Sequence, residues 1–347
     1  VRFSGNGLSR WPALAALLTV GEFARGYVLS GFPWNLPGYI FESGSSLSQF
    51  AAYAGIYGLS FLVLLMSAIT AMALIGEKRA AASTALAVLM GSIFALGHYR
   101  LSQVQPAFVE DVKIRIVQVP FSQKDKFDRR KSIGIVNEFI RMSAQPGIGD
   151  VTHLNWPEGA VVGLALENTP LLEAMGNVLT TNDKTPPYWL LNSLRREKQP
   201  GRDGELRENY YNTSAVIAYD AQGFPAVVGL NDKTRLVPFG EYFPGGEWVE
   251  KLGSKTLSTS LASITPAPKK LLSEFPGLPP VSPQICYEII FPGLTPRPQS
   301  GSAPEWILNQ SNDAWYGRSI GPAQHANIAA YRAIEEGIPI VRSASNG

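Results

Sequence analysis

The residue type in this chain best suited to covalent chemistry is its single cysteine, Cys286. It ends an apolar run that begins at Val281, and an acidic residue, Glu288, follows two positions later. The thiolate rather than the thiol is the nucleophile, so a catalytic cysteine requires a base or a cation beside it. A lone cysteine is more often an inert buried side chain. Taken alone, Cys286 therefore leaves both interpretations open.

Two other segments carry a base and a cation. Glu158 follows Trp-Pro at the end of a predicted strand, and α/β proteins place their sites at that edge of a sheet. An apolar environment would raise the pKa of Glu158 and suit it to accept the thiol proton. Lys233 follows Asn-Asp in what looks like a strand end or a turn, and its ammonium would lower the thiol pKa and stabilise an oxyanion. The alternatives are an ordinary turn glutamate and a solvated lysine.

The bulk composition excludes several other classes of function. The net charge of +2 gives no electrostatic case for binding nucleic acid. One cysteine excludes an intrachain disulfide, and so cysteine usage does not identify the redox compartment. One cysteine and three scattered histidines give no metal-ligand spacing, and no Gly-rich phosphate loop is present. We therefore expect neither a metal nor a cofactor.

The hydrophobic residues are unevenly distributed. Residues 1–108 carry few charges and long apolar runs, whereas residues 110–347 alternate like a soluble α/β protein. The runs Leu59–Gly76 and Ala80–Gly97 are about as long as the minimum for crossing a bilayer, roughly 18–20 residues. A pair of buried core helices is the alternative. Trp11–Gly21 is shorter and is a candidate for a third, partly truncated span.

The loop between the two apolar runs predicts their orientation. It contains the basic pair Lys78-Arg79, which the positive-inside rule assigns to the cytoplasm. The chain after about Tyr99 would then lie outside the cytoplasm. The segment Gly31–Tyr39 is aromatic and Pro-rich, as suits a loop at a membrane interface.

From residue 112 onward, predicted strands alternate with predicted helices, which favours an α/β fold. The helices are expected at Arg130–Met142 and Pro322–Glu336, the second with Pro in its first turn and Gly337 after it. The strands are expected at Ile114–Val119, Val151–Trp156, Tyr188–Asn192, Thr213–Tyr219, Val281–Tyr287, Glu305–Gln310 and Pro339–Ser343. The connection Tyr242–Pro280 is long and rich in Gly, Pro and Ser, which predicts a lid that contacts lipid or, alternatively, a floppy insertion.

Several sequence blocks carry a resemblance to a known family. The order Glu158, Lys233, Cys286 resembles the nitrilase superfamily. Three further blocks narrow this resemblance to one family within the superfamily. They are Leu-Val-Pro-Phe-Gly-Glu-Tyr at 236–242, Cys-Tyr-Glu-Ile-Ile-Phe-Pro at 286–292 and the Gly-Phe-Pro-Trp that begins at Gly31. With the apolar N-terminal third, they make the chain similar to the apolipoprotein N-acyltransferases, bacterial membrane enzymes that add the third acyl chain to lipoproteins.

The resemblance implies a nitrilase-like α-β-β-α sandwich preceded by transmembrane α-helices. It implies a transmembrane region over 1–108 and a catalytic domain over 109–347, in a multi-pass protein of the bacterial inner membrane with the catalytic domain on the periplasmic side. Cys286 would form a thioester with an acyl chain from a phospholipid, and the α-amine of a diacylglyceryl-apolipoprotein would then accept it. No nucleotide or other cofactor is needed, because a thioester is reactive enough to acylate an amine.

The same resemblance assigns supporting roles to three further residues. Glu241 would keep Lys233 charged and oriented, Glu288 matters two places after the cysteine, and Tyr287 would help to shape the acyl site. His325 suggests a Cys-His dyad, but Ala and Ile surround it on a predicted helix, and we expect a structural role. Arg235 departs from the family pattern, which has histidine there.

The chain begins with Val1 and stops just after a strand-like run, so we expect a fragment of a longer protein that lacks both ends. Two other functions remain open. A membrane-tethered amidase would use the same three residues to hydrolyse a small C–N substrate, with water as second substrate. A catalytically dead lipid-binding scaffold would have no need for an intact Glu158, Lys233 and Cys286.

Overall fold

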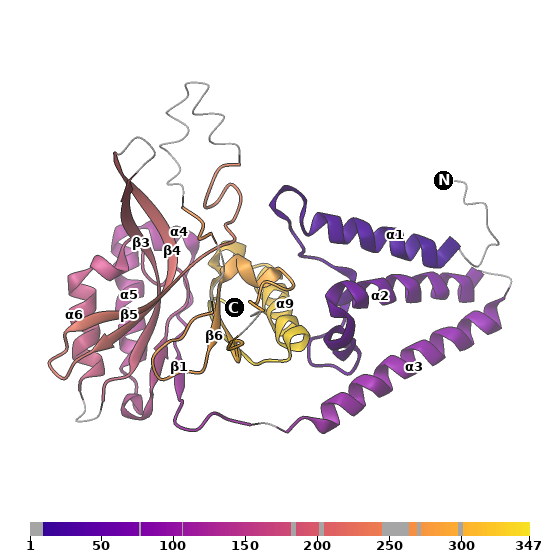
Figure 1. Ribbon diagram of the computed structural model, residues 1–347, viewed down its shortest axis with the longest axis horizontal. Coiled ribbons are helices and arrows are strands. Elements are labelled where there is room, and N and C mark those ends of the chain that lie inside the picture. Colours follow the sequence, from indigo (N-terminus) through magenta and orange to yellow (C-terminus); the bar gives the residue numbers. More distant parts are fainter. Residues whose placement is uncertain are drawn as a thin grey trace. The chain divides into compact units, whose positions relative to one another are not determined.

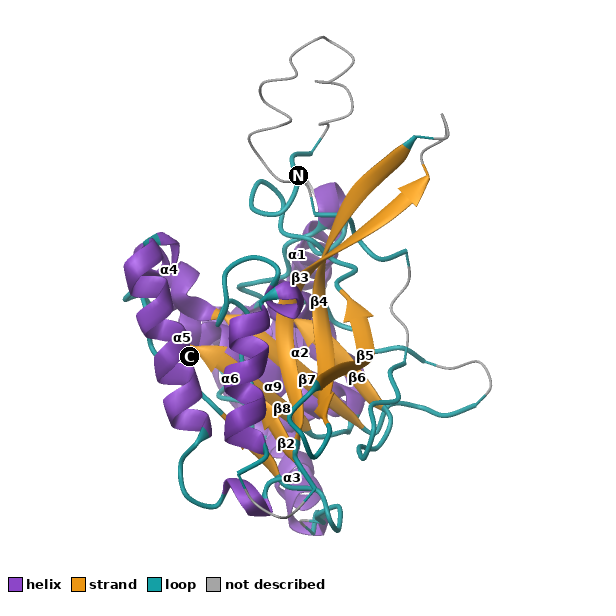
Figure 2. Ribbon diagram, turned by 90° about the vertical axis from the view of Figure 1, so that its left-hand side faces the viewer, coloured by secondary structure: helices purple, strands orange, loops and turns teal. Residues whose placement is uncertain are grey.

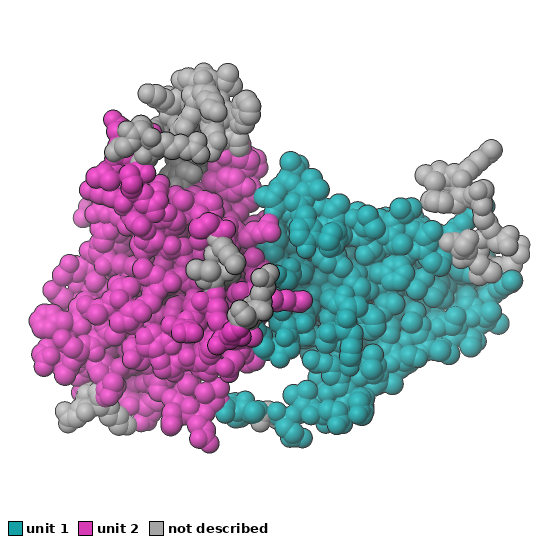
Figure 3. Space-filling model, in the orientation of Figure 1, with its two compact units in different colours: residues 1–108, 290–293, 324–338 teal, residues 109–289, 294–323, 339–347 magenta. Residues whose placement is uncertain are grey.

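Figure 1 shows a computed structural model that describes residues 10–75, 78–105, 107–181, 185–200, 205–244, 264–268, 272–297 and 301–347. The chain divides into two compact units, coloured separately in Figure 3. The first comprises Val1–Phe108, Ile290–Gly293 and Gln324–Ile338, and the second comprises Val109–Ile289, Leu294–Ala323 and Pro339–Gly347.

Long apolar helices dominate the first unit. They are α1 (Arg10–Arg25), α2 (Ala51–Ile75) and α3 (Arg79–Gln103). The segments Leu47–Ile75 and Arg79–Gln103 are long and apolar enough to cross a membrane, and only 17% of each apolar window is buried. The predicted runs at 59–76 and 80–97 therefore lie in longer helices. With 16 residues, α1 is about 24 Å long, short of a hydrocarbon core of about 30 Å.

A break in α2 is the point at which distant parts of the first unit are joined by hydrogen bonds and an ion pair. Gly55 has a φ of +65°, which interrupts the helical hydrogen bonds and leaves the amide of Ile56 in need of another acceptor. The Glu335 carboxylate accepts a hydrogen bond from that amide at 2.6 Å. Arg332 forms an ion pair with Glu335 at 2.7 Å and donates a hydrogen bond to the Tyr39 hydroxyl at 3.0 Å. Residues far apart in the sequence are thereby joined at one buried point.

The second unit contains a mixed five-stranded sheet in the order β1-β2-β3-β4-β5. Strands β1 to β3 are parallel, and β3 to β5 are antiparallel. The strands are β1 (Ile114–Ile116), β2 (His153–Asn155), β3 (Tyr188–Pro200), β4 (Leu206–Tyr219) and β5 (Pro225–Asp232).

Helices α5 (Arg129–Ser143) and α6 (Thr169–Leu179) cover one face of this sheet (Figure 2). Phe139 of α5 and Met175 of α6 are buried in one apolar cluster with Trp156 and Trp189. The Trp156 ring meets the Trp189 ring edge-on at 4.7 Å between centroids, and its indole N–H donates to the Ser143 hydroxyl at 2.9 Å. The segment that precedes Glu158 is therefore rigidly packed.

A second sheet of three parallel strands packs against the other face. Its strands are β6 (Val281–Ile285), β7 (Trp306–Asn312) and β8 (Ile340–Ser345). Leu190 and Val216 of the first sheet form a buried cluster with Val281 and Leu308 of the second. The helix α9 (Gly321–Glu336) connects β7 to β8 and matches the predicted helix within one residue at its start. The expected α/β fold preceded by apolar helices is confirmed.

The structure corrects some of the predicted element bounds. The strand predicted over 114–119 is limited to β1, and β3 extends eight residues beyond the predicted end at Asn192. Cys286 and Tyr287 do not continue β6 but begin a 3₁₀ turn, Cys286–Ile290. Strand β5, helix α6 and the short helix α4 (Gln123–Phe127) were not predicted.

Candidate active site

Three strand ends bring Glu158, Lys233 and Cys286 together. Glu158 follows β2, Lys233 comes directly after β5, and Cys286 comes directly after β6. All three side chains are buried. The Lys233 Nζ lies 3.5 Å from the Glu158 Oε1, and the Cys286 thiol is hydrogen-bonded to the Glu158 carboxylate. The nucleophile, base and cation considered from the sequence thus form one cluster drawn from both sheets.

The Glu158 carboxylate is surrounded by donors. Burial acts to raise its pKa, but the Lys233 charge and the hydrogen bonds from Asn212 and Cys286 outweigh burial and hold the pKa below its usual range. Asn212 donates its amide N–H to Oε1 at 2.8 Å, and the backbone amide of Asn312 donates to Oε2 at 3.2 Å. The expectation of a raised pKa was wrong, because the site is polar rather than apolar. Glu158 is therefore an ionised carboxylate in contact with a thiol, ready to accept its proton.

The Lys233 ammonium lies between two carboxylates. It donates to Glu241 Oε1 at 2.9 Å and lies 3.5 Å from Glu158 Oε1. Burial acts to lower the pKa of Lys233, but the charges of Glu158 and Glu241 outweigh it and raise the pKa well above its ordinary value. Glu241 is held in turn by Asn212 at 2.9 Å and by the backbone amide of Val237 at 2.8 Å. Lys233 is thus a fixed, permanent cation.

Cys286 adopts a left-handed backbone conformation with a φ of +46°, which is strained for a residue with a side chain. Burial raises the pKa of its thiol well above its ordinary value, and the neighbouring Glu158 charge raises it further. The Lys233 charge lowers it, as the sequence suggested, but does not prevail. Cys286 is therefore a neutral thiol at rest, with the Glu158 carboxylate as the neighbouring proton acceptor.

Glu288 joins the lysine segment to the cysteine turn through hydrogen bonds. Its Oε1 accepts hydrogen bonds from the Thr234 amide at 2.8 Å, the Thr234 hydroxyl at 2.7 Å and the Arg235 amide at 3.2 Å. Its Oε2 accepts from the amide of Ile285, the residue before the cysteine, at 2.8 Å. Tyr287 is buried in the same turn, and burial raises its pKa to about 12.

The sequence reasoning missed several polar residues of the site. Asn212 bridges Glu158 and Glu241 through one amide nitrogen, and its Oδ1 accepts from Asn192 at 2.7 Å. Asn192 and Asn212 lie in the middle of their strands. The only sequence signal that could have identified them is an asparagine at a position where a strand is buried. Lys126, on α4, is attracted to the charge of Glu158. Nothing in the alternation of apolar residues distinguishes it from its neighbour Lys124.

The other candidates do not belong to this cluster. His325 belongs to the first unit, where its ring packs against Trp34 at 5.2 Å between centroids. Most of the predicted lid at 242–280 falls outside the described residues. One described piece, 264–268, runs beside the lysine segment, where the Ala267 amide donates to the Lys233 carbonyl at 2.9 Å. Among the described residues, no group of three or more His, Cys, Asp or Glu is arranged to hold a metal ion.

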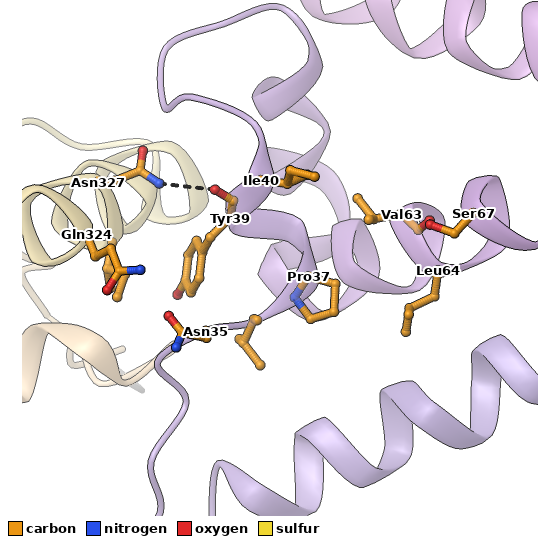
Figure 4. Close-up of a pocket in the computed structure, with 11 residues that line it drawn as sticks. Asn35, Pro37, Tyr39, Ile40, Val63, Leu64, Ser67, Gln324 and Asn327 are labelled. Carbon is orange, nitrogen blue, oxygen red and sulfur yellow. Dashed lines mark hydrogen bonds between the residues drawn. The ribbon is translucent and has the colours of Figure 1, made fainter. Parts of the chain in front are cut away.

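The first unit holds a cavity of about 400 Å³ (Figure 4). Carboxamides of Asn35, Gln324 and Asn327 line it beside apolar side chains of α2, including Val63 and Leu64. The Asn327 amide donates to the Tyr39 carbonyl at 3.4 Å. Its lining contains no carboxylate, lysine or cysteine, so this cavity suits binding rather than acid–base chemistry.

Comparison with known proteins places the second unit in a family. Residues 113–347 match the family model described as carbon-nitrogen hydrolase. The chain belongs to the carbon–nitrogen hydrolase family. The α/β sandwich is therefore the nitrilase-like fold expected from the sequence. Residues 1–69 match a second model, described as the apolipoprotein N-acyltransferase N-terminal domain.

Individual relatives extend over both parts of the chain. An apolipoprotein N-acyltransferase from Bradyrhizobium diazoefficiens is 33% identical over 98% of this chain and 63% of its own length. One from Caulobacter vibrioides is 34% identical over the same shares. The chain thus spans less than two thirds of the length of these relatives. Among solved structures, a mutant amidase from Nesterenkonia sp. AN1 with acrylamide added at its active-site cysteine is similar, with 14% identity, a TM-score of 0.32 and coverage of 67% of this chain and 78% of that one.

Proposed function

We propose that this chain is the membrane-associated catalytic part of an apolipoprotein N-acyltransferase. The observation that carries the proposal is the buried Glu158-Lys233-Cys286 cluster in a chain that resembles these enzymes across both of its parts. The acyl donor would be a membrane phospholipid, and the acceptor would be the N-terminal α-amine of a diacylglyceryl-apolipoprotein. Glu158, Lys233 and Cys286 would be catalytic, and Glu241, Tyr287 and Glu288 would support them.

In the first half-reaction, the Cys286 sulfur attacks the ester carbonyl of the donor while Glu158 accepts the thiol proton. Lys233 stabilises the negative charge that develops on the carbonyl oxygen. The carbon–oxygen bond then breaks, and Glu158 returns its proton to the departing oxygen of the lysophospholipid. A thioester on Cys286 remains, and Glu158 is again a carboxylate.

In the second half-reaction, the neutral α-amine of the acceptor attacks the thioester carbonyl, and Glu158 accepts a proton from the nitrogen. The carbon–sulfur bond breaks as the amide forms, and the proton passes to the sulfur to restore the thiol. One carboxylate therefore serves both steps, which agrees with its contact to Cys286 and its fixed position. Each half-reaction leaves the total charge of the cluster unchanged.

We assign residues 1–108 to the membrane region and residues 109–347 to the catalytic domain. Exposed apolar side chains on the long helices support a membrane location, because such surfaces are unfavourable in water. Ile75 is 81% exposed, Leu74 is 68% exposed and Val88 is 61% exposed. We place the protein in the bacterial inner membrane, multi-pass, with the catalytic domain on the periplasmic side, as the basic pair Lys78-Arg79 suggests.

Intact-protein and peptide mass spectrometry would test the proposal. The protein, in its full natural length and in detergent, is incubated with phospholipid beside Cys286→Ala. We expect a fatty-acyl mass on the Cys286 peptide that hydroxylamine removes and that the variant lacks. Folded protein that gains no acyl group yet hydrolyses a small amide would overturn acyl transfer in favour of a membrane-tethered amidase. Folded protein that does neither would favour a non-catalytic lipid-binding scaffold.

A further inference from the structure

A second lysine faces the candidate active site from α4. Ser122 begins this helix by accepting a hydrogen bond from the Asp125 amide at 3.0 Å. The Lys126 ammonium lies against Gly159, the residue after Glu158, because a Cβ added to Gly159 would lie only 2.6 Å from the Lys126 Nζ. Gly159 also has a φ of +78°, so its conformation and its lack of a side chain both serve this close approach.

The two lysines of the site differ in how their charges are balanced. Lys233 contacts two carboxylates, Glu158 and Glu241. Lys126 forms no hydrogen bond or ion pair with any residue that the structure describes, and its ammonium lies 5.8 Å from the centre of the Phe127 ring. Burial lowers the pKa of Lys126, and the charge of Glu158 opposes that effect. Lys126 is thus a half-buried cation with donor capacity left over.

Gln123, one turn earlier on α4, contributes a second donor. The Asn312 Oδ1 accepts hydrogen bonds from the Ala314 amide and the Ser345 hydroxyl, which fixes the orientation of the Asn312 carboxamide. Its Nδ2 therefore donates to the Gln123 Oε1, at 3.2 Å. The Gln123 Nε2 is then a donor, and it is buried without a hydrogen-bond partner among the described residues. A buried donor without an acceptor is costly, which points to a ligand that supplies one.

We propose that Gln123 and Lys126 bind the phosphodiester of the acyl-donor lipid. The inference rests on the proposed function and adds a residue-level account of donor recognition. A phosphodiester carries a permanent negative charge and several acceptor oxygens, which suits one ammonium and one carboxamide N–H. In a glycerophospholipid only the short glycerol backbone separates the phosphodiester from the ester carbonyl, which agrees with a cation that lies against Gly159, the residue after Glu158. The α-amine of the acceptor has no negative charge, so the Lys126 ammonium would not attract it.

The experiment compares a donor that has a phosphodiester with one that lacks it. Thioester formation on Cys286 is followed with a phosphatidyl donor and with a neutral p-nitrophenyl fatty-acyl ester, in the full-length protein. The variants are Lys126→Ala, Lys126→Arg and Gln123→Ala. Lys124→Ala is the matched control, because Lys124 lies on the same helix with an exposed side chain. Any effect of Lys126 on the pKa of Glu158 is common to both donors and cancels in their ratio.

We expect Lys126→Ala to lower kcat/KM for the phosphatidyl donor, relative to that for the neutral ester, about tenfold to a hundredfold through KM. Gln123→Ala should act in the same direction by a smaller factor, Lys126→Arg should retain most of the preference, and Lys124→Ala should change neither donor. An equal loss of kcat for both donors would assign Lys126 to the reacting oxygens instead and overturn the phosphodiester site. No loss for either donor would also overturn it. If the unmodified protein forms no thioester with either donor, the proposed function fails rather than this site.

Discussion

Replacing Glu288 with glutamine would test whether this carboxylate positions the nucleophile. Its two oxygens accept four hydrogen bonds from the lysine segment and from Ile285. Glutamine has nearly the same shape but only one acceptor oxygen. In either orientation its NH₂ group therefore faces a buried donor, either the Ile285 amide or the three donors of Thr234 and Arg235.

Of the two orientations of the glutamine side chain, the one that loses only the hydrogen bond from Ile285 costs less stability. A hydrogen bond to a charged group contributes about 1.5–3 kcal/mol, and the buried amide left without an acceptor adds to the loss, so we expect about 2–4 kcal/mol in all. For a domain of this size that corresponds to a fall of about 5–15 °C in the unfolding temperature. Because Ile285 precedes the strained Cys286, we also expect thioester formation to slow about 100-fold, as a displacement of about 1 Å does elsewhere.

Thermal unfolding in detergent and the rate of thioester formation on Cys286 would measure both effects. Thr234→Val removes a single hydroxyl donor and should give a smaller loss of each. Glu274→Gln is the matched control, because Glu274 is exposed in the same unit. If Glu288→Gln stays within about twofold of the original rate and within about 2 °C of its unfolding temperature, Glu288 does not position the cysteine.

Two further predictions concern pH. Because the thiol pKa of Cys286 is raised, iodoacetamide should alkylate Cys286 more slowly at pH 7.5 than it alkylates a free cysteine peptide, and the rate should still rise at pH 9. Peptide mass spectrometry would measure the rate of alkylation. A rate that reaches a plateau below pH 8.5 would contradict the raised pKa. Because the folded pKa of Glu158 is depressed, its stabilising contribution is present above its unfolded value and is lost as pH falls through the folded pKa. The unfolding temperature of Glu158→Gln, measured by calorimetry, should therefore fall less from pH 6 to pH 3 than that of the original protein, and equal falls would contradict the shift.

Much of the fold could be predicted because its main elements carry strong local signals. The amphipathic pattern before Ser143 predicted α5, and Pro322 with Gly337 gave the bounds of α9 within one residue. Strand β5 was missed because it begins at Pro225, contains Gly229 and leaves several apolar side chains exposed, so it lacks the usual alternation. Gly229 is required by a close neighbour, since an added Cβ would lie 2.9 Å from the Phe275 ring.

The candidate site could be predicted only where residues follow strand ends. Glu158 and Cys286 each lie at the end of a predicted strand, and the flanking sequence blocks identified them together with Lys233. The turn at Cys286 could not be predicted, because a cysteine with a positive φ has no sequence signal of the kind that glycine gives. Asn212 and Lys126 are brought to the site by long-range strand pairing and helix placement, which residue spacing alone does not encode.

The charges of the site explain why its nucleophile rests as a thiol. Glu158, Glu241 and Lys233 together carry one negative charge, and a thiolate at Cys286 would add a second in a buried place. Burial and Glu158 both oppose that state, so the pKa of the thiol rises while that of Glu158 falls. In the proposed mechanism, the thiol proton moves when the sulfur bonds to a carbonyl carbon and the new charge develops beside the Lys233 ammonium. Such a nucleophile resists adventitious alkylation and oxidation, and it becomes reactive only when a carbonyl substrate is held against it.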